Sequence, residues 1–346
     1  MGCDSIGTNR RRPRIYQCDI VMLMKPFLVC VLAVSAFAQQ TPQQPPRQPV
    51  DAGLPTIKVD VNLVNVLFSV RDRKGTLIPN LTKDDVHVFE DGKEQQIHVF
   101  TKESDLPLTI GLLVDVSRSQ ENLIEIERRA ALQFFRQVLR PKDLAFLISF
   151  GSEAELVQDY TNSTKLLDSG LNQLRVDAPV GGFGPGPVPT IGQPRGTILF
   201  DAVYLAANEK LKGEVGRKAM ILITDGVDQG SRLKLREALE AAQKADCIIY
   251  SIYYVDWRAY GPFGGGGGGE GDLKKMSEET GGRVFKVDRK YSLDMIFDEI
   301  QREMRSQYSL GYSPANAARD GSFRKLEIRT NHKDYRVQAR KGYYAQ

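Results

Sequence analysis

Short apolar runs alternate with amphipathic stretches between residue 106 and about residue 307 of this chain. The apolar runs predict strands at residues 108–114, 144–150, 219–224, 247–254 and 283–287, with a short edge partner near 154–159. In the stretch 120–139, apolar residues recur at steps of three and four and form one helical stripe: Leu123, Ile126, Ala130, Phe134 and Val138. This alternation predicts fold class α/β, with a doubly wound, mostly parallel sheet and helices on both faces.

Hard oxygen donors follow two of these runs. Asp115, Ser117 and Ser119 stand at alternate positions directly after the run 108–114, and Asp225 follows the run 219–224. Thr197 opens a further segment between them. Ligands bind beyond the carboxyl ends of parallel strands, so we expect Asp115 and Asp225 at one edge of the sheet. Oxygen donors of this kind favour Mg²⁺, with Mn²⁺ or Ca²⁺ as alternatives.

Each of these features also has an ordinary structural explanation. Asp115 and Ser117 suit the cap of the following helix, and Asp225 with Gly226 suits a turn. A site that keeps its fold and has lost its metal is a further alternative. We interpret Asp201 as a structural residue that supports the Thr197 segment and not as a ligand.

In this order, the five residues resemble the metal-ion-dependent adhesion site of von Willebrand factor A (VWFA) domains. The resemblance implies that Ser117 and Ser119, and in some members Thr197, coordinate the metal directly. It implies that Asp115 and Asp225 act through water or by hydrogen-bonding the hydroxyls. It also implies an open metal position for an Asp or Glu of a protein partner, and therefore a binding protein and not an enzyme.

The flanking segments change to the alternation of half-buried strands. Residues 54–104 predict an N-terminal β module, with a strand from Val59 to Val70 and a hairpin from which 96–100 returns. Residues 308–346 predict a C-terminal β segment with two strands, at 323–329 and 335–343. We expect both segments to build one small β-sandwich, into which a VWFA domain at 105–307 is inserted.

The flanks also carry a narrower resemblance, to the exported VWFA-related proteins that are abundant in acidobacteria. It rests on four segments, at residues 81–86, 89–96, 310–314 and 340–344. One position departs from the VWFA pattern, because Gln120 replaces the hydrophobic residue often found after the second serine. That difference concerns packing at the start of a helix.

The N-terminal residues have the pattern of a secretory signal. Lys25 precedes the apolar run 27–34, which an Ala-x-Ala exit at 36–38 follows. We expect a signal peptide at 1–38 and a Pro/Gln-rich linker at 39–53, with an uncleaved anchor as the alternative. The apolar run is short for a bilayer span, so no stable membrane anchor is expected after cleavage. The protein is therefore expected to be exported, either periplasmic or secreted.

Charge and cysteine content exclude two classes of function. The formal net charge is +4, but residues 1–38 hold five basic and two acidic side chains, and their removal leaves 42 basic against 41 acidic, a net charge of +1. Such a balance does not indicate a nucleic-acid-binding protein. Only Cys247 remains after residue 38, in an apolar run where burial is expected, so no cysteine-built zinc or iron–sulfur site is expected.

The sequence thus predicts an exported, metal-dependent binding or adhesion protein whose partner is a protein or other ligand with an exposed Asp or Glu. Two alternatives remain open: a structural or assembly scaffold with an idle metal site, and a metal-assisted hydrolase. Two Gly/Pro-rich segments, 179–196 and 260–271, are expected beside the site. They are either recognition loops or insertions without a role.

Overall fold

The computed structural model describes residues 63–102, 106–177, 196–256, 258 and 268–345. These residues belong to one compact unit, Val59–Gln346. The expected signal peptide, the linker, the residues before Leu63 and most of both Gly/Pro-rich segments lie outside the described residues.

A six-stranded sheet forms the centre of the α/β module, in the order β10-β9-β8-β5-β6-β7. Every neighbouring pair is parallel except β6 and β7. Its strands are β5 (Leu108–Asp115), β6 (Leu144–Phe150), β7 (Ala154–Thr161), β8 (Arg217–Thr224), β9 (Cys247–Tyr253) and β10 (Val284–Lys286). The predicted fold class is confirmed.

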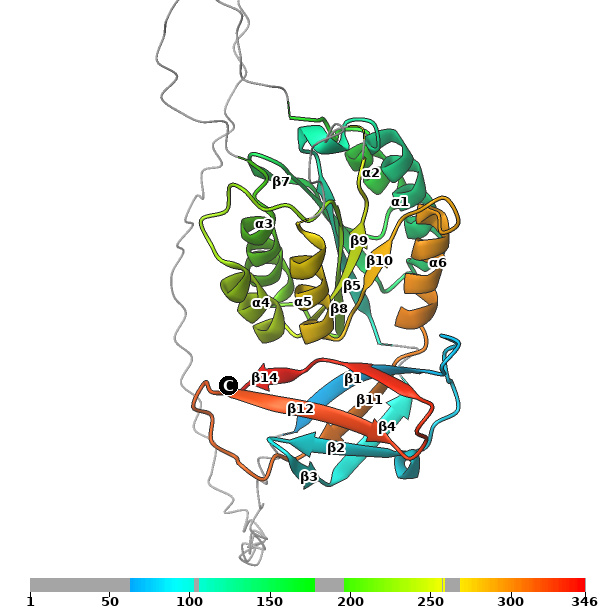
Figure 1. Cartoon of the computed structure of the whole chain (residues 1–346), viewed down its shortest axis with the longest axis vertical. Helices are drawn as coiled ribbons and strands as arrows, with labels where there is room; N and C mark the ends of the chain where they lie inside the picture. Colours follow the sequence, from blue (N-terminus) through cyan, green and yellow to red (C-terminus); the bar gives the residue numbers. More distant parts are fainter. Residues whose placement is uncertain (1–62, 103–105, 178–195, 257, 259–267, 346) are drawn as a thin grey trace, which may run out of the picture. The chain divides into compact units, whose positions relative to one another are not determined.

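Helices cover both faces of this sheet (Figure 1). One face packs against α1 (Ile124–Val138), α2 (Thr164–Leu171) and α6 (Leu293–Met304). The other packs against α3 (Leu199–Leu205), its π-helical continuation η3 (Ala206–Leu211), α4 (Leu235–Lys244) and α5 (Glu270–Thr280). Strand β5 is buried along its whole length because its side chains alternate between two apolar cores, with Leu112 in the first and Leu113 in the second.

The stripe predicted for α1 is wrong at one position. Ile126 is 40% exposed, whereas Glu127 is only 1% exposed. Leu123, Ala130 and Phe134 are buried as expected. The row of α1 that faces the core therefore includes position 127. An apolar pattern cannot identify this position, because its residue is a glutamate.

Two antiparallel four-stranded sheets form the β-sandwich, in the orders β13-β1-β11-β4 and β14-β12-β2-β3. The N-terminal segment supplies β1 (Val64–Arg71), β2 (Val86–Glu90), β3 (Lys93–Gln95) and β4 (Ile97–Lys102). The C-terminal segment supplies β11 (Tyr308–Tyr312), β12 (Phe323–Thr330), β13 (Arg336–Ala339) and β14 (Gly342–Tyr344). Because β1 pairs with β11 and β12 with β2, the two segments share one core, as expected.

Two of the expected strand connections differ. The hairpin partner of β2 is the three-residue strand β3, while β4 crosses to the other sheet and pairs with β11. The single strand expected at 335–343 is divided into β13 and β14, which also belong to different sheets. Strands of three or four residues are too short to show a period of two, so the sequence pattern merged them with their neighbours.

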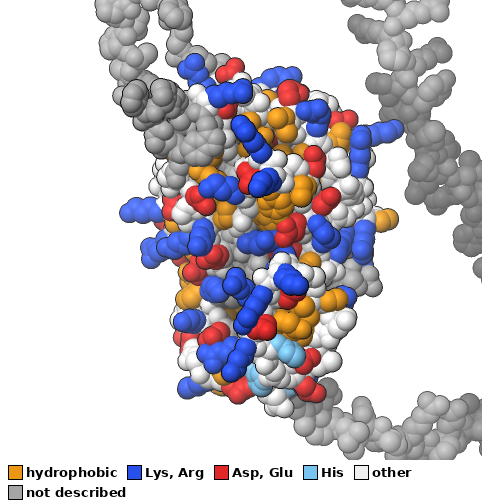
Figure 2. Space-filling view, turned by 45° about the vertical axis from the view of Figure 1, so that its right-hand side comes forward, with side chains coloured by type: hydrophobic (Ala, Val, Ile, Leu, Met, Phe, Trp, Pro, Cys, Tyr) orange, Lys and Arg blue, Asp and Glu red, His pale blue; other side chains and the backbone are white. Residues whose placement is uncertain are grey.

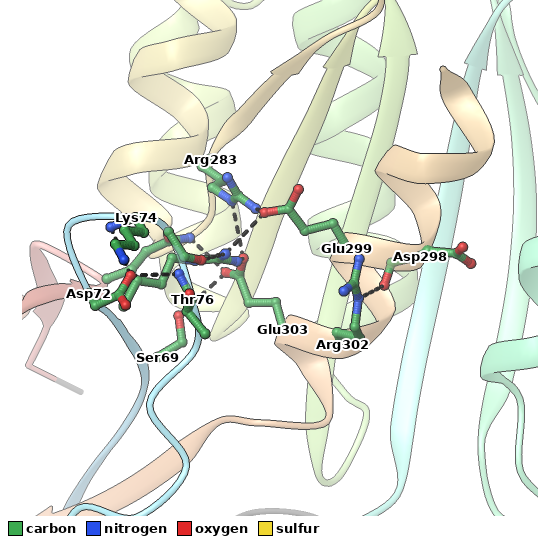
Figure 3. A network of polar contacts seen from close by, with 12 residues as sticks. Ser69, Asp72, Lys74, Thr76, Arg283, Asp298, Glu299, Arg302 and Glu303 are labelled. Atoms are coloured by element: carbon green, nitrogen blue, oxygen red, sulfur yellow. Dashed lines mark hydrogen bonds and ion pairs between the residues drawn. The ribbon is translucent and has the colours of Figure 1, made fainter. Parts of the chain in front are cut away.

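A network of buried polar contacts joins α6 to the sandwich (Figure 3). Glu303 is 1% exposed and accepts hydrogen bonds from Arg71 of β1, from Arg283 and Tyr250 of the α/β module, and from Gln338 of β13. Glu299, one turn earlier, also contacts both Arg71 and Arg283. Two carboxylates on one helix face therefore bind guanidinium groups from both modules.

The distribution of surface charges and the position of the remaining cysteine agree with the sequence patterns. On the face drawn in Figure 2, basic and acidic side chains are interspersed over the described residues. Cys247 is buried and its thiol is free. No helix in the described part of the chain has the length and apolarity needed to cross a bilayer.

Candidate metal centre

The centre is built where two neighbouring parallel strands end. Strands β5 and β8 are paired, with Val114 opposite Ile223. Strand β5 ends at Asp115, and β8 ends at Thr224, directly before Asp225. The register therefore brings both aspartates to the carboxyl edge of the sheet, where such sheets bind ligands.

Short hydrogen bonds connect four of the five predicted residues. One carboxylate oxygen of Asp115, Oδ1, accepts the backbone N–H of Ser117 at 2.9 Å. The Oγ atoms of Ser117 and Ser119 are 3.0 Å apart, and the Ser119 hydroxyl donates to Oδ2 of Asp225 at 2.7 Å. Both serines are partly exposed, whereas both aspartates are buried. The cluster thus has hydroxyls toward solvent and carboxylates behind them.

Thr224 is a member of this cluster that the sequence reasoning missed. Its side chain is fully buried, and its hydroxyl donates to Oδ2 of Asp115 at 2.5 Å. The hydroxyl oxygen of Thr224 in turn accepts the backbone N–H of Gly226 at 2.9 Å. Thr224 therefore holds the Asp115 carboxylate and the turn after β8 together. The available signal was a polar residue that closes an apolar run directly before an aspartate.

Thr197 lies at the same edge but outside the hydrogen-bonded cluster. Its carbonyl accepts the N–H groups of Gln229 and Gly230, at 3.0 and 3.1 Å, in the loop that follows Asp225. The next residue, Ile198, donates its N–H to the carbonyl of Gly151, just after β6. Among the described residues, no hydrogen bond joins the Thr197 hydroxyl to the aspartates and serines of the cluster. The structure therefore places the Thr197 backbone, and leaves its metal-binding role a prediction.

Asp201 ties the loop after β8 to helix α3. Its carboxylate accepts the N–H of Arg232 at 3.1 Å and that of Leu233 at 2.9 Å. In the same loop, Asp228 accepts the N–H of Phe200 at 3.2 Å. These contacts agree with the interpretation of Asp201 as a structural residue, because its carboxylate accepts hydrogen bonds from backbone amides of this loop.

Two glycines allow a close backbone approach beside Asp225. Gly226 has φ +77°, a left-handed conformation that side chains disfavour. Gly269, just before α5, lies so close that a Cβ built on it would be 2.0 Å from the carbonyl carbon of Gly226. The turn that positions Asp225 therefore needs glycine at both places.

Burial and like charge make the metal-free centre electrostatically unfavourable. Asp115 is 0% and Asp225 2% exposed. Burial, followed by the charge of Asp225, raises the pKa of Asp115 to about 7, against the opposing hydrogen bonds from Ser117 and Thr224. A bound cation would remove this penalty, because it favours the charged form of both carboxylates.

Glu127 adds a third buried carboxyl group behind the centre. Burial and the charge of Asp115 raise the pKa of Glu127 well above its ordinary value. Neither of its carboxylate oxygens has a hydrogen-bond partner among the described residues. Gln120 is also buried nearby in the chain, and its side-chain amide donates to the carbonyl of Tyr254 at 3.3 Å. Neither role was predicted from the sequence.

The donor set fits a hard divalent cation. Asp115, Asp225, Ser117 and Ser119 present only oxygen atoms, which Mg²⁺, Mn²⁺ and Ca²⁺ prefer. Within the described ranges, no group of three or more His, Cys, Asp or Glu side chains is arranged to hold a metal ion. A metal centre at this edge therefore depends on the serine hydroxyls as well as on the carboxylates.

Comparisons with known proteins yield structural likenesses only. No protein-family model matches the sequence, and no curated protein matches it. The chain is similar to the conserved hypothetical protein BatB from Bacteroides thetaiotaomicron, with 17% identity over 57% of this chain and 97% of that one, and a TM-score of 0.41. It is similar to a von Willebrand factor type A protein from Catenulispora acidiphila, with 12% identity over 81% and 63% of the two chains and a TM-score of 0.44.

A third similar structure is proximal thread matrix protein 1 from the mussel byssus, which has a zinc-occupied MIDAS motif. The identity is 14% over 62% of this chain and 50% of that one, with a TM-score of 0.44. At such identities and scores we draw no argument from these likenesses. The fold class rests instead on the strand order, the parallel pairing and the helices on both faces of the sheet.

Proposed function

We propose that this protein is an exported binding protein that captures an acidic group of its ligand through a divalent cation. The cation would be held by Asp115, Ser117, Ser119 and Asp225, with Thr197 completing the set in the manner of a VWFA adhesion site of the exported acidobacterial type. Mg²⁺ is the expected metal, and Mn²⁺ or Ca²⁺ are alternatives.

One observation carries this proposal. Two buried carboxylates, Asp115 and Asp225, lie at the carboxyl edge of the sheet and are linked through two serines. The backbone N–H of Ser117 donates to Asp115, the hydroxyls of Ser117 and Ser119 contact each other, and the Ser119 hydroxyl donates to Asp225. The carboxylates favour a cation, while the neutral hydroxyls lie toward solvent. Neutral ligands leave the cation electron-poor, so it can attract one further carboxylate from outside.

The surrounding residues hold this arrangement in place. Thr224 fixes the orientation of the Asp115 carboxylate, and the backbone N–H of Val227 donates to Oδ1 of Asp225 at 3.1 Å. Asp201 anchors the loop that follows. Because these side chains are already held in place, ligand binding would cost less conformational entropy.

The remaining parts of the proposal concern location and partner. Residues 1–38 have the pattern of a signal peptide, which supports export to the periplasm or the medium. The partner is expected to be a protein, or another extracytoplasmic ligand, with an exposed Asp or Glu and not a nucleic acid. Fractionation of cells that express the full chain tests this location, and recovery in the cytoplasm with an uncleaved N-terminus would contradict export.

Selection of displayed random peptides on the immobilised chain tests the acidic ligand. Binding is carried out in Mg²⁺ and elution in EDTA, and we expect the eluted peptides to be enriched in Asp or Glu. The variant Ser119→Ala should yield no such enrichment. Ser169→Ala is the matched control, because Ser169 is an exposed serine on α2. Eluted peptides without a carboxylate, or equal enrichment on Ser119→Ala, would contradict the proposal. In a separate assay, hydrolysis of a phosphate ester by the unmodified chain that disappears in Asp225→Asn would also contradict it.

A further inference from the structure

Three buried oxygen atoms near the metal centre have no hydrogen-bond partner. Two are the carboxylate oxygens of Glu127, and the third is Oε1 of Gln120. Gln120 is 0% exposed and Glu127 is 1% exposed. In the part of the chain that the structure describes, no other buried side-chain oxygen is left in this way. Buried polar atoms are costly unless a donor or a cation satisfies them, so these three acceptors indicate a ligand.

Both side chains belong to the segment that leads from the metal-centre serines into α1. The carbonyl of Gln120 accepts the N–H of Leu123 at 2.8 Å, and the carbonyl of Leu123 accepts that of Glu127 at 3.0 Å. Residues three and four apart in a helical segment lie on the same face. Long helical side chains lean toward the N-terminus of the helix, which is the direction of Gln120 from Glu127.

Tyr254, the residue after β9, is a common neighbour of the two side chains. The Gln120 side-chain amide donates to the carbonyl of Tyr254 at 3.3 Å, which leaves Oε1 as the unused atom of that amide. Burial, followed by the charge of Glu127, raises the pKa of the Tyr254 hydroxyl. The unsatisfied oxygens therefore lie where the start of α1 packs against the end of β9.

A proton alone does not satisfy the Glu127 carboxyl group. Burial and the charge of Asp115 raise its pKa, so this group takes up a proton readily when nothing else is bound. The protonated group would then need an acceptor for its O–H and a donor for its other oxygen. Neither oxygen has a hydrogen-bond partner among the described residues. A cation, in contrast, interacts favourably with all three oxygens at once.

We propose that Glu127 and Oε1 of Gln120 bind one Na⁺ ion, with water as the remaining ligand. Only hard oxygen atoms are offered, and one buried carboxylate balances one positive charge, whereas a divalent ion would keep an uncompensated charge in the interior. The charge of Asp115, which acts on Glu127, adds to the negative potential at this place. The bound ion would hold the serine-bearing segment against the end of β9. This inference does not depend on the metal centre.

Thermal unfolding of the full chain in EDTA at pH 8 tests the proposal. The chain is unfolded in sodium chloride and in tetramethylammonium chloride at equal ionic strength, because the second cation is too large for a buried site. We expect the melting temperature to be higher in Na⁺ by about 3 °C or more, as for a well-occupied site in a chain of this size. Equal melting temperatures would overturn the proposal and would indicate that water or a proton satisfies the oxygens.

Glu127→Gln removes the charge at nearly constant side-chain size and should abolish the difference between the two salts. Glu125→Gln is the matched control, because the Glu125 side chain is 72% exposed on the same helix. It should keep the full difference. If Glu127→Gln fails to fold, Gln120→Met replaces it, since it removes one of the three oxygens and should reduce the difference. An undiminished difference in Glu127→Gln or in Gln120→Met would contradict the assignment.

Asp115→Asn separates this ion from the metal centre, where Na⁺ would also reduce the repulsion between the aspartates. It should keep a higher melting temperature in Na⁺. A difference that disappears in Asp115→Asn and persists in Glu127→Gln would place the ion at the metal centre and overturn the proposal. Sodium NMR measures binding directly: the unmodified chain should broaden the Na⁺ resonance more than Glu127→Gln does, and equal broadening by both would contradict a site at Glu127.

Discussion

The Asp115 carboxyl group should make the stability of the metal-free protein depend on pH. Burial and the nearby Asp225 raise its pKa in the folded state to about 7, from 3.8 in an unperturbed chain. The folded state therefore binds a proton that the unfolded state has released, and between these values stability falls as pH rises. The penalty is absent below about pH 4 and fully developed above about pH 7.

We therefore expect Asp115→Asn to stabilise the metal-free protein at pH 8 and to stabilise it much less at pH 5, where only part of the penalty is present. A shift of this size corresponds to a few kcal/mol, on the order of 1.4 kcal/mol for each pKa unit. Urea unfolding in EDTA at both pH values measures it. Excess Mg²⁺ should stabilise the unmodified protein at pH 8 and leave the variant unchanged.

Asp334→Asn is the control, because the Asp334 side chain is 63% exposed. It should change stability little at either pH. Equal stability of Asp115→Asn and the unmodified chain at pH 8 would show that burial and the charge of Asp225 do not penalise the ionised Asp115 side chain as described.

At the level of residues, the sequence identified the four clustered side chains but not all of the residues around them. Asp115, Ser117, Ser119 and Asp225 were recognisable because each follows an apolar run at a spacing that a strand end imposes. Glu127 was not, because its burial depends on which row of α1 faces the sheet, and a helix pattern with Ile126 next to it is ambiguous. The Thr197 hydroxyl stays untested, since spacing cannot orient a side chain at the end of a loop.

Among the elements, the approach of α5 to the turn after β8 controls the position of Asp225. We expect Gly269→Ala to weaken Mg²⁺ binding at least tenfold, because its Cβ would overlap the backbone of Gly226 and displace the turn. Calorimetric titration with Mg²⁺ measures the effect.

Gly271→Ala provides the matched control two residues away. A Cβ at Gly271 meets nothing within 4 Å, and the residue lies inside α5. It should leave Mg²⁺ affinity unchanged and stabilise the protein by up to about 1 kcal/mol, as Ala commonly does relative to Gly in a helix. Equal affinities of Gly269→Ala and Gly271→Ala would contradict the close approach.

The predictable elements are those whose burial requires a long, continuous run of apolar residues in the sequence. The central strands β5, β6 and β9 were predicted within one residue of their observed ends, because both of their faces are buried. The crossing of β4 to the other sheet was not predictable, since it depends on pairing with β11, more than 200 residues later. Local alternation contains no information about such a partner.

On the scale of the whole molecule, Glu303 links the stability of the two modules. Its buried carboxylate contacts Arg71 of the sandwich and Arg283 of the α/β module. We expect Glu303→Gln to lower the free energy of unfolding by about 3 kcal/mol, because it leaves the guanidinium groups of Arg71 and Arg283 with Glu299 in place of two carboxylates. It should also separate a single thermal transition into two.

Glu278→Gln is the control, because Glu278 is an exposed residue of α5. It should leave one transition at nearly the same temperature. Differential scanning calorimetry distinguishes these results. A single unshifted transition for Glu303→Gln would mean that the polar network contributes little to the joining of the modules.

The β-sandwich is built from two segments that lie far apart in the sequence. Strand β11 lies between β1 and β4, so neither segment completes that sheet alone. The alternating flanks indicated two β segments, but only the pairing of β1 with β11 and of β2 with β12 shows how they share a core. The two β segments expected from the sequence, 54–104 and 308–346, therefore describe parts of one sandwich and not separate sheets.

Calorimetric titration of the full chain with Mg²⁺ tests the central claim most directly. We predict saturable binding at one site, lost in both Asp115→Asn and Ser119→Ala and retained in Ser169→Ala. Absence of binding in the unmodified chain, or undiminished affinity in Asp115→Asn or Ser119→Ala, would contradict the assignment of this strand edge as a metal centre.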